Sequence, residues 1–428
     1  MLIQILYIIL EKSNTNSLNL FRRSPMFRRD STQPWHPSFF LAALGAGGMA
    51  VAFFMYLMWM VPHKNYPMPT WDHWTTAWSA DIASGIPMPL IIGFAISGVV
   101  VFGLMHIALL VWNIREYNAV KGTEAHQKIL NSPAEVQMMA LPLTFAMTVN
   151  VMFVMGALFV PGLWTIIEWM FPGALAAFLI IGYYSLKMYG RYLGRMLTQG
   201  GYRSEEHNHL SPLMAAFTFS MLSVGFAAPA AMSHIPAVIT IASVFSYLFL
   251  IAAVLVVLVV LVSGVNAMMQ HGLQEQATPS LWMLVPIVTL LGIEWLRMEH
   301  GIAHLTGGAL DASNNFQMMT LLVTLQAVIL MVGYRVMKLN GYLDKYLHGG
   351  EHSPVAFGLV CPGVAFFVLN LFWWHVAIVG TGIVAKFGLV YWLGIGAMFL
   401  IQAATIYAIV RLTGNMLRHP ELVIEPAV

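Results

Sequence analysis

SPVAFGLVCPGVAFFVLNLFWW, residues 353–374, is long and apolar enough to cross a bilayer, which takes about 20 apolar residues. Its middle holds Cys361, Pro362 and Gly363. Proline removes a backbone donor and disturbs the preceding turn, so we predict a broken helix here. Broken helices at membrane depth are tolerated where protein or a water-filled cavity satisfies the freed backbone groups. We therefore expect this span to line a cavity rather than to face lipid.

Four other apolar stretches open in the same way. Each carries a proline near its first turn, where proline fits best in a helix. Successive prolines are far enough apart for two spans, which predicts internal duplication with two spans per repeat. The alternative is that prolines simply begin membrane helices often. The five prolines are Pro37, Pro142, Pro212, Pro279 and Pro354.

The composition predicts a polytopic membrane protein, because 59% of the residues are hydrophobic and only 9% are charged. The expected fold is all-α, with ten transmembrane helices arranged as five helical hairpins. The ten expected spans are residues 39–61, 90–114, 138–159, 169–189, 213–232, 237–269, 281–298, 316–337, 355–376 and 387–411.

We divide the chain into three parts. Residues 1–35 are predicted to be a cytoplasmic N-terminal tail, residues 36–415 the ten-helix transmembrane domain, and residues 416–428 a cytoplasmic C-terminal tail. Whether residues 1–25 belong to the native protein is left open.

The basic residues predict the orientation in the membrane. All but three of the 20 Lys and Arg residues lie in the terminal segments or in the connections on one side. The exceptions are Lys64, Arg297 and Lys386. Because cytoplasmic loops carry excess Lys and Arg, both termini are expected in the cytoplasm, with the protein in a bacterial inner membrane.

Five hairpins with proline-marked first helices resemble the tellurite-resistance/dicarboxylate transporter family, which includes the TehA-type and SLAC-type anion channels. The resemblance covers roughly residues 36–415 and also rests on PSFFLAALGAGGMAV at residues 37–51. It points to a divergent prokaryotic branch, with the TsoY-type membrane (seleno)proteins as one candidate.

The resemblance implies a pore lined by spans 1, 3, 5, 7 and 9 in each subunit of a homotrimer, and a small anion as substrate. It also implies that a phenylalanine of span 9, Phe367 or Phe366, plugs the pore. Val364 and Val360 share a helix face with Phe367, whereas Gly363 leaves Phe366 room to swing. A fixed ring suits a constitutive plug, so we favour Phe367 as the gate.

Small or polar residues recur eight positions after four of the prolines, as a ring of equal depth in a pore would require. These residues are Gly45, Asn150, Ser220 and Pro362. Together with Gly48 of the glycine-rich first span and with Cys361, they are the predicted pore lining. Chance remains the competing explanation for this spacing.

Span 7 departs from an apolar pore because Glu294, Arg297 and His304 fall on one helix face. One interpretation is an outer vestibule in which Arg297 attracts anions, since charges within a span tend to face a cavity or to pair. The other interpretation is a local ion pair between Glu294 and Arg297 that only positions the helix.

The second functional hypothesis is a redox or accessory subunit of a membrane complex that uses Cys361 and the in-span histidines. A lone cysteine in an apolar helix is more often a small packing residue. The histidines considered for haem are His106, His234, His271 and His375.

No nucleotide-binding loop, HExxH zinc motif or nucleophile elbow occurs. The sequence therefore predicts neither an enzyme nor a cofactor or metal site, and no nucleic-acid partner. The leading hypothesis is a channel or carrier for a small anion, such as an inorganic anion, an oxyanion or a dicarboxylate, with the lipid bilayer and the anion as partners.

Overall fold

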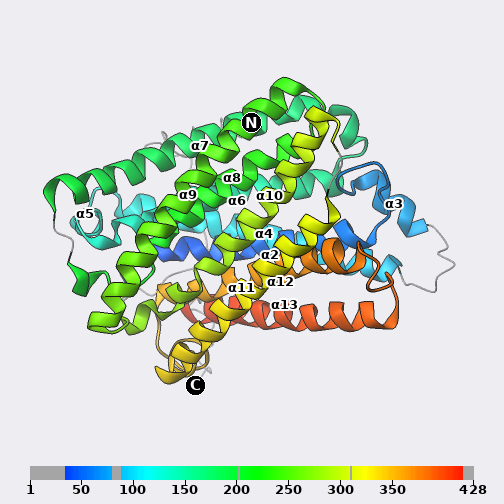
Figure 1. Cartoon of the computed structure of the whole chain (residues 1–428). Coiled ribbons are helices and arrows are strands. Elements are labelled where there is room, and N and C mark those ends of the chain that lie inside the picture. Colours follow the sequence, from blue (N-terminus) through cyan, green and yellow to red (C-terminus); the bar gives the residue numbers. More distant parts are fainter. Residues whose placement is uncertain (1–33, 80–87, 201–202, 309–310, 418–428) are drawn as a thin grey trace, which may run out of the picture.

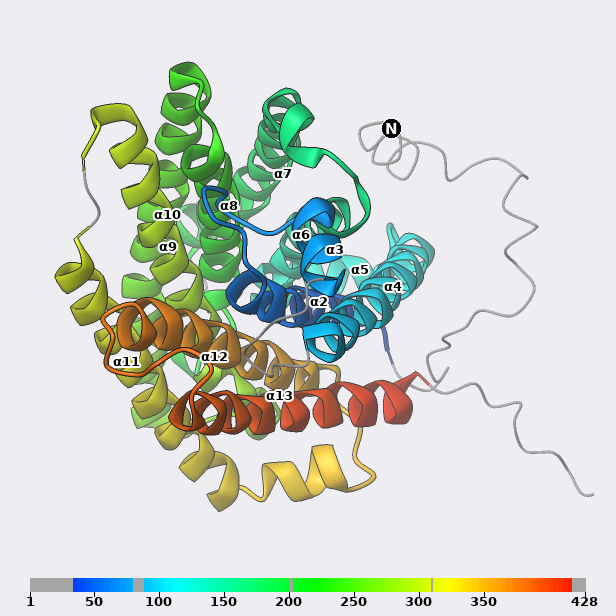
Figure 2. The ribbon, with the colours of Figure 1, turned by 90° about the vertical axis from the view of Figure 1, so that its right-hand side faces the viewer.

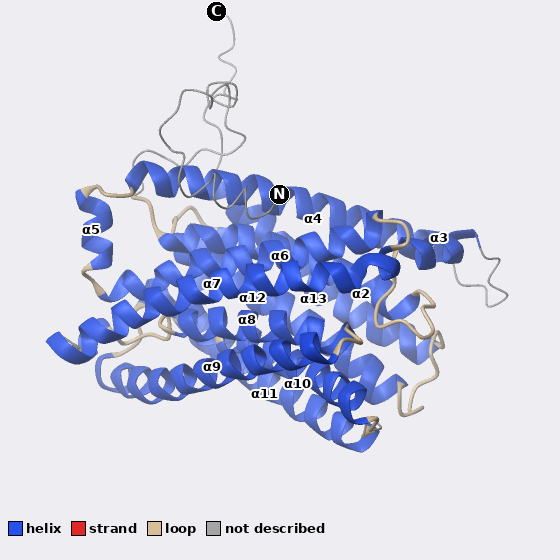
Figure 3. Ribbon diagram, turned by 90° about the horizontal axis from the view of Figure 1, so that it is seen from above, coloured by secondary structure: helices blue, strands red, loops and turns tan. Residues whose placement is uncertain are grey.

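The computed structural model describes residues 34–79, 88–200, 203–308 and 311–417, and all regular structure in these ranges is helical (Figure 3). Ten of the helices are long and apolar enough to cross a membrane, which confirms the prediction of ten spans. The predicted tails, residues 1–35 and 416–428, lie almost wholly outside the described residues.

Five helices form an inner ring. They are α2 (Phe40–Met60), α6 (Ala140–Phe159), α8 (Leu213–Met232), α10 (Leu284–Thr306) and α12 (Val360–Phe372). In the most apolar 18-residue stretch of each of these spans, 61–94% of the residues are buried. Each helix contacts the next, and α12 contacts α2, so the ring is closed.

Five further helices surround this ring (Figure 2). They are α4 (Met88–Val120), α7 (Leu163–Gln199), α9 (Pro236–His271), α11 (Ala312–Leu339) and α13 (Leu389–Met416). Each packs against the inner helix that precedes it in sequence, which makes five hairpins. Only 17–44% of their most apolar stretches are buried, so their exposed apolar side chains are suited to face lipid.

Short helices in the connections mark the two ends of the bundle (Figure 1). Helix α3 (Trp71–Ser79) follows α2 at one end, and α5 (Glu124–Leu130) precedes α6 at the other. Each inner helix begins at the α5 end. The distribution of basic residues predicts that this end faces the cytoplasm, and that orientation stays a prediction.

Four of the five inner spans open with 3-10 turns, and this corrects the proline assigned to span 3. The turns are η2 (Pro37–Phe39), η3 (Pro133–Met139), η5 (Glu275–Trp282) and η7 (Pro354–Leu359). Span 3 therefore opens with Ser132-Pro133, whereas Pro142 is the third residue of α6. Pro286 and Pro362 occupy the same third position in α10 and α12.

The expected break in span 9 is not present. The chain stays helical from η7 through α12 into a π-helical segment, η8 (Trp373–Val379). The first N–H groups of an α-helix have no partner four residues earlier within that helix. Because Pro362 stands among these positions of α12, its missing donor does not interrupt the helix.

Candidate functional site

A cavity of about 520 Å³ lies inside the inner ring, and all five inner helices contribute to its lining. We call it the central cavity. It begins near the starts of the inner helices, at Leu44 and Cys361, and extends toward the α3 end, at Trp59 and Phe372. Most of its lining is apolar, so a charged group inside it stands out chemically.

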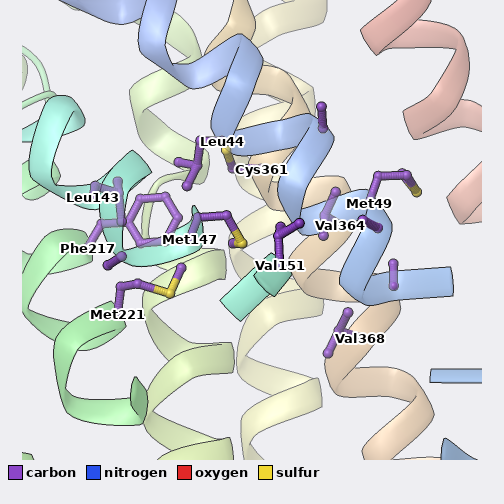
Figure 4. Packing of buried hydrophobic residues seen from close by; sticks show 14 of the residues in the cluster. Leu44, Met49, Leu143, Met147, Val151, Phe217, Met221, Cys361, Val364 and Val368 are labelled. Carbon is purple, nitrogen blue, oxygen red and sulfur yellow. The ribbon is translucent and has the colours of Figure 1, made fainter. Parts of the chain in front are cut away.

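Phe217 of α8 lines the central cavity near its α5 end. Its ring is only 4% exposed although it belongs to the cavity lining. Figure 4 shows it near Leu143 and Met147 of α6. An aromatic ring in this place narrows the space between α8 and the facing inner helices.

A second cavity, of about 590 Å³, lies at the α5 end and is called the vestibule here. It is lined by residues that precede the inner helices or their first turns, among them His36, Gln137, His209 and Gln274. Unlike the central cavity, it is rich in polar side chains. The first turns of the inner helices lie between the two cavities.

Two vestibule histidines hold the starts of inner spans. The Nδ1 atom of His36 accepts a hydrogen bond from the Ser38 N–H, and Nδ1 of His209 accepts one from the Ser211 N–H, each at 3.2 Å. Burial lowers the pKa of His36 to about 4, and burial together with nearby His207 lowers the pKa of His209 to about 4. Both rings are therefore neutral near pH 7, as an accepting Nδ1 requires.

Arg297 of α10 lines the central cavity and is partly exposed to it. Its Nη1 donates a hydrogen bond to the Val224 carbonyl of α8 at 2.8 Å. No carboxylate of the described residues pairs with it. Because a guanidinium has five N–H donors, this arginine has donors left for a ligand. Arg297 is thus part of the lining of the central cavity.

Glu294 points away from Arg297. Its side chain is 1% exposed, and Oε1 accepts a hydrogen bond from the Ser246 hydroxyl of α9 at 2.9 Å. The hypothesis of a Glu294–Arg297 ion pair is therefore wrong. Three residues are slightly less than one helical turn, and this offset of about 60° is enough to place the two side chains against different neighbours.

His304 lies beyond the central cavity. It is exposed near the α3 end, and its ring stacks on that of His234 with centroids 5.6 Å apart. The histidine of α10 that lines the cavity is His300, whose Nδ1 lies 2.7 Å from the Leu296 carbonyl. The predicted outer vestibule of Glu294, Arg297 and His304 is thus not one site, since only Arg297 reaches the cavity.

Four of the six residues predicted to line a pore do line the central cavity, namely Gly45, Gly48, Asn150 and Cys361. Ser220 and Pro362 lie outside its lining. The Ser220 hydroxyl donates to the Ala216 carbonyl of its own helix at 2.8 Å. The two residues outside the lining are spaced from Pro212 and Pro354, whereas Asn150, spaced from the misassigned Pro142, does line the cavity, so a spacing of eight residues from a proline does not select the side of a helix that faces the cavity.

Neither phenylalanine predicted as a gate lines the central cavity. Phe367 is fully buried and packs on Tyr56 of α2, with ring centroids 5.8 Å apart. Phe366 is partly buried. On α12 the cavity face is formed by Val364, Val368 and Phe372, among others. Near the α5 end of the cavity, the aromatic residue in the lining is Phe217.

The two most buried in-span histidines use both ring nitrogens within the protein. Nδ1 of His106 lies 2.7 Å from the Ala43 carbonyl, and its Nε2 lies 2.9 Å from the Thr148 hydroxyl. His375 contacts the Leu371 carbonyl and the Tyr391 hydroxyl in the same way. These nitrogens join helices to one another, so they do not offer free ligands to a haem.

Other histidines named for haem lie near the ends of the bundle. His234 lies 3.4 Å from Glu168, and His271 lies 2.9 Å from the Ser204 hydroxyl. Within the described part of the chain, no group of three or more His, Cys, Asp or Glu side chains is arranged to hold a metal ion.

Phe217, His300 and Asn315 are among the residues of the central cavity that the sequence analysis did not identify. Asn315 of α11 is 5% exposed, and its Oδ1 has no hydrogen-bond partner. A polar residue early in an apolar span was a usable signal for Asn315. No signal in the sequence identified Phe217, because it differs from the other apolar residues of α8 only in that its side chain faces the cavity.

The sequence matches no family model, and no curated protein sequence is significantly similar to it. The fold and the geometry of the cavities are therefore the basis for a functional assignment.

Proposed function

We propose that this protein is a membrane channel or carrier for small anions, and that the anion binds to Arg297 in the central cavity. The observation that carries this proposal is a guanidinium inside an apolar cavity with no described carboxylate to neutralise it. Charged side chains within membrane spans are costly and typically mark a path for ions or substrates. A transport role fits this arrangement better than catalysis.

The chemistry of arginine favours an anionic ligand. Its planar fork binds carboxylates and other oxyanions through two parallel hydrogen bonds, which are stronger than neutral ones. The apolar walls of the central cavity lower the local dielectric constant and so strengthen this attraction. An anion at Arg297 would also offset the cost of holding the guanidinium away from water.

The two cavities provide a path along the inner ring. Anions would enter the vestibule, where all inner helices begin. Helix N-termini favour negative charge, whereas Glu205 and Glu206 in the vestibule lining oppose it. They would then pass Phe217 to reach Arg297. We propose Phe217 as the gate, because it lines the central cavity near the α5 end, where the vestibule lies.

The closed ring of five hairpins supports membership of the tellurite-resistance/dicarboxylate transporter family as part of this proposal. The resemblance implied a gate on span 9, and the proposed gate on α8 departs from it. The homotrimer implied by the same resemblance stays a prediction. The redox alternative has no comparable support, since His106 and His375 are engaged in internal hydrogen bonds.

Anion flux into proteoliposomes tests the proposal, with chloride, nitrate, sulfite and a dicarboxylate as probes. Arg297→Gln should lower flux about tenfold to hundredfold, because a hydrogen bond to a charged group contributes about 1.5–3 kcal/mol. The loss should persist at high salt, since salt screens buried charges weakly. Arg335→Gln, at an exposed arginine of α11, is the matched control and should leave flux unchanged.

Two results would contradict the proposal. One is equal flux through wild-type protein and Arg297→Gln at the same reconstituted amount. The other is no flux of any probe through wild-type protein or through the gate variant described below.

A further inference from the structure

The central cavity contains one fixed charge. Of all the described residues that line it, Arg297 is the only Lys, Arg, Asp or Glu. Its other polar side chains, among them Asn150, Thr289, His300 and Asn315, carry no permanent charge. A ligand that fills the cavity therefore meets a single positive charge, which matches one negative charge and leaves a second one without a partner.

The volume and walls of the cavity suit an organic molecule. A water molecule occupies about 30 Å³ of liquid, so a small inorganic ion would leave most of the 520 Å³ to water. Cavities of roughly 300–1,000 Å³ with apolar walls and few polar groups are typical sites for organic ligands. The walls here are rich in methionine and aromatic rings, including Met58, Met147, Met221, Phe153, Phe178 and Phe372.

Methionine suits an organic ligand for a further reason. Its unbranched, polarisable side chain adapts to irregular shapes, which is useful where a ligand body must be enclosed. Met147 and Met221 lie on facing helices, α6 and α8 (Figure 4). Asn315 adds an unpartnered oxygen on the α11 side of the cavity.

We propose that the ligand of the central cavity is an organic monoanion with an apolar body. Its carboxylate or sulfonate group binds Arg297, and its body packs against the methionine and aromatic walls. A dicarboxylate would bind less favourably, because its second charge would lie against apolar walls. A small inorganic anion would leave the apolar walls in contact with water. This inference rests on the proposed function and narrows its substrate class.

Calorimetric titration of the protein in lipid nanodiscs separates charge from apolar contact, using butyrate, acetate, succinate and butyramide. Butyrate and succinate have the same carbon count but differ by one charge, and butyramide has none. Burial of apolar groups predicts about fourfold tighter binding per methylene, so butyrate should bind about fifteenfold tighter than acetate. Succinate and butyramide should each bind at least about tenfold more weakly than butyrate.

Variants assign these differences to the cavity. Arg297→Gln should remove the preference for butyrate over butyramide, and Arg335→Gln should not. Ala228→Phe adds bulk at a small residue of the cavity wall. It should remove the advantage of butyrate over acetate while acetate still binds. If Arg297→Gln does not fold, the butyramide comparison and Ala228→Phe still decide the question.

The outcomes are distinct. Binding of nitrate or succinate as tight as that of butyrate, and lost in Arg297→Gln, overturns the substrate class but leaves the proposed anion site standing. No anion binding, or binding that Arg297→Gln leaves unchanged, overturns both. The inference is supported if butyrate binds most tightly, acetate more weakly and butyramide most weakly, and if these differences depend on Arg297.

Discussion

In the proposed path, the gate depends on which of two phenylalanine rings faces the central cavity. Phe217 lines the central cavity at its α5 end, whereas Phe367 is buried between α2 and α12 against Tyr56. Truncation of the first ring should widen the path, and truncation of the second should leave an internal void. Substitution of the two residues by alanine is therefore expected to have different effects on anion flux and on stability.

Phe217→Ala should raise anion flux through reconstituted protein, because the side chain that narrows the path is removed. Phe367→Ala should instead lower the stability by about 3–5 kcal/mol, as is common for a buried phenylalanine, without raising flux. Flux assays and denaturation midpoints in detergent measure the two effects. Increased flux in Phe367→Ala alone would return the gate to span 9.

His209 makes stability depend on pH. Burial lowers its pKa to about 4, while the unfolded chain binds the proton near pH 6.5. Its contribution is therefore complete above pH 6.5 and is lost as the pH falls toward 4, by up to about 3 kcal/mol. The midpoint of denaturation should drop further between pH 7 and pH 4.5 in wild-type protein than in His209→Gln. Parallel curves for the two proteins would exclude this role.

At the residue scale, the sequence identified which side chains are chemically unusual better than it predicted which neighbours those side chains face. Arg297 was identified because a charge in an apolar span is unusual, and it does reach the cavity. Its supposed partner Glu294 instead binds Ser246 of α9. Which side of a helix faces which neighbour depends on the crossing of helices, and a pattern along one helix does not contain that information.

Among the elements, α8 and α10 make an unusually close approach. A Cβ atom on Gly301 of α10 would lie 2.7 Å from the Ala230 carbonyl oxygen of α8. Small residues at such contacts let helix backbones pack closely in a membrane. This contact lies near the α3 end of the central cavity and helps to fix the position of α10, which carries Arg297.

Gly301→Ala should therefore destabilise the protein, since the methyl group would force two backbones apart. The matched control is Gly396→Ala in α13, where an added Cβ meets no atom within 4 Å. That change should be neutral or stabilising by about 0.5–1 kcal/mol, because alanine favours a helix more than glycine does. Thermal denaturation of the two variants in detergent compares them. A larger loss in Gly396→Ala would refute the close-contact argument.

The sequence predicted the elements well, apart from their first turns. Apolar length identified all ten spans, and the basic residues fell at consistent ends. The equivalence of the prolines was misread because Pro142 resembles an opening proline, whereas Ser132-Pro133 lay in a stretch taken as a polar loop. A 3-10 turn adds several residues before the α-helix begins. Apolar content alone does not show which residues belong to the turn and which to the α-helix.

For the whole molecule, the inner ring explains why this many spans are needed. Each inner helix contributes one wall of the central cavity, and each outer helix covers it from the side expected to face lipid. The repeat predicted the five hairpins from the sequence, and the family resemblance implied that their first helices surround a central space. The closure between the first and last hairpins could not be predicted, because it depends on how far each hairpin turns relative to the one before.

Because the ring is closed, the same arrangement of helices could form whichever hairpin came first in the chain. Helix α13 contacts α2, and the described chain starts and stops at the α5 end, so a linker from Leu417 to Pro34 would join neighbouring hairpins. A circular permutant cut between α7 and α8 should therefore keep Arg297-dependent anion binding. A permutant cut inside α12 should lose it. During translation, equally, the cavity cannot exist until the fifth hairpin arrives, so the growing chain holds no completed path across the membrane before then.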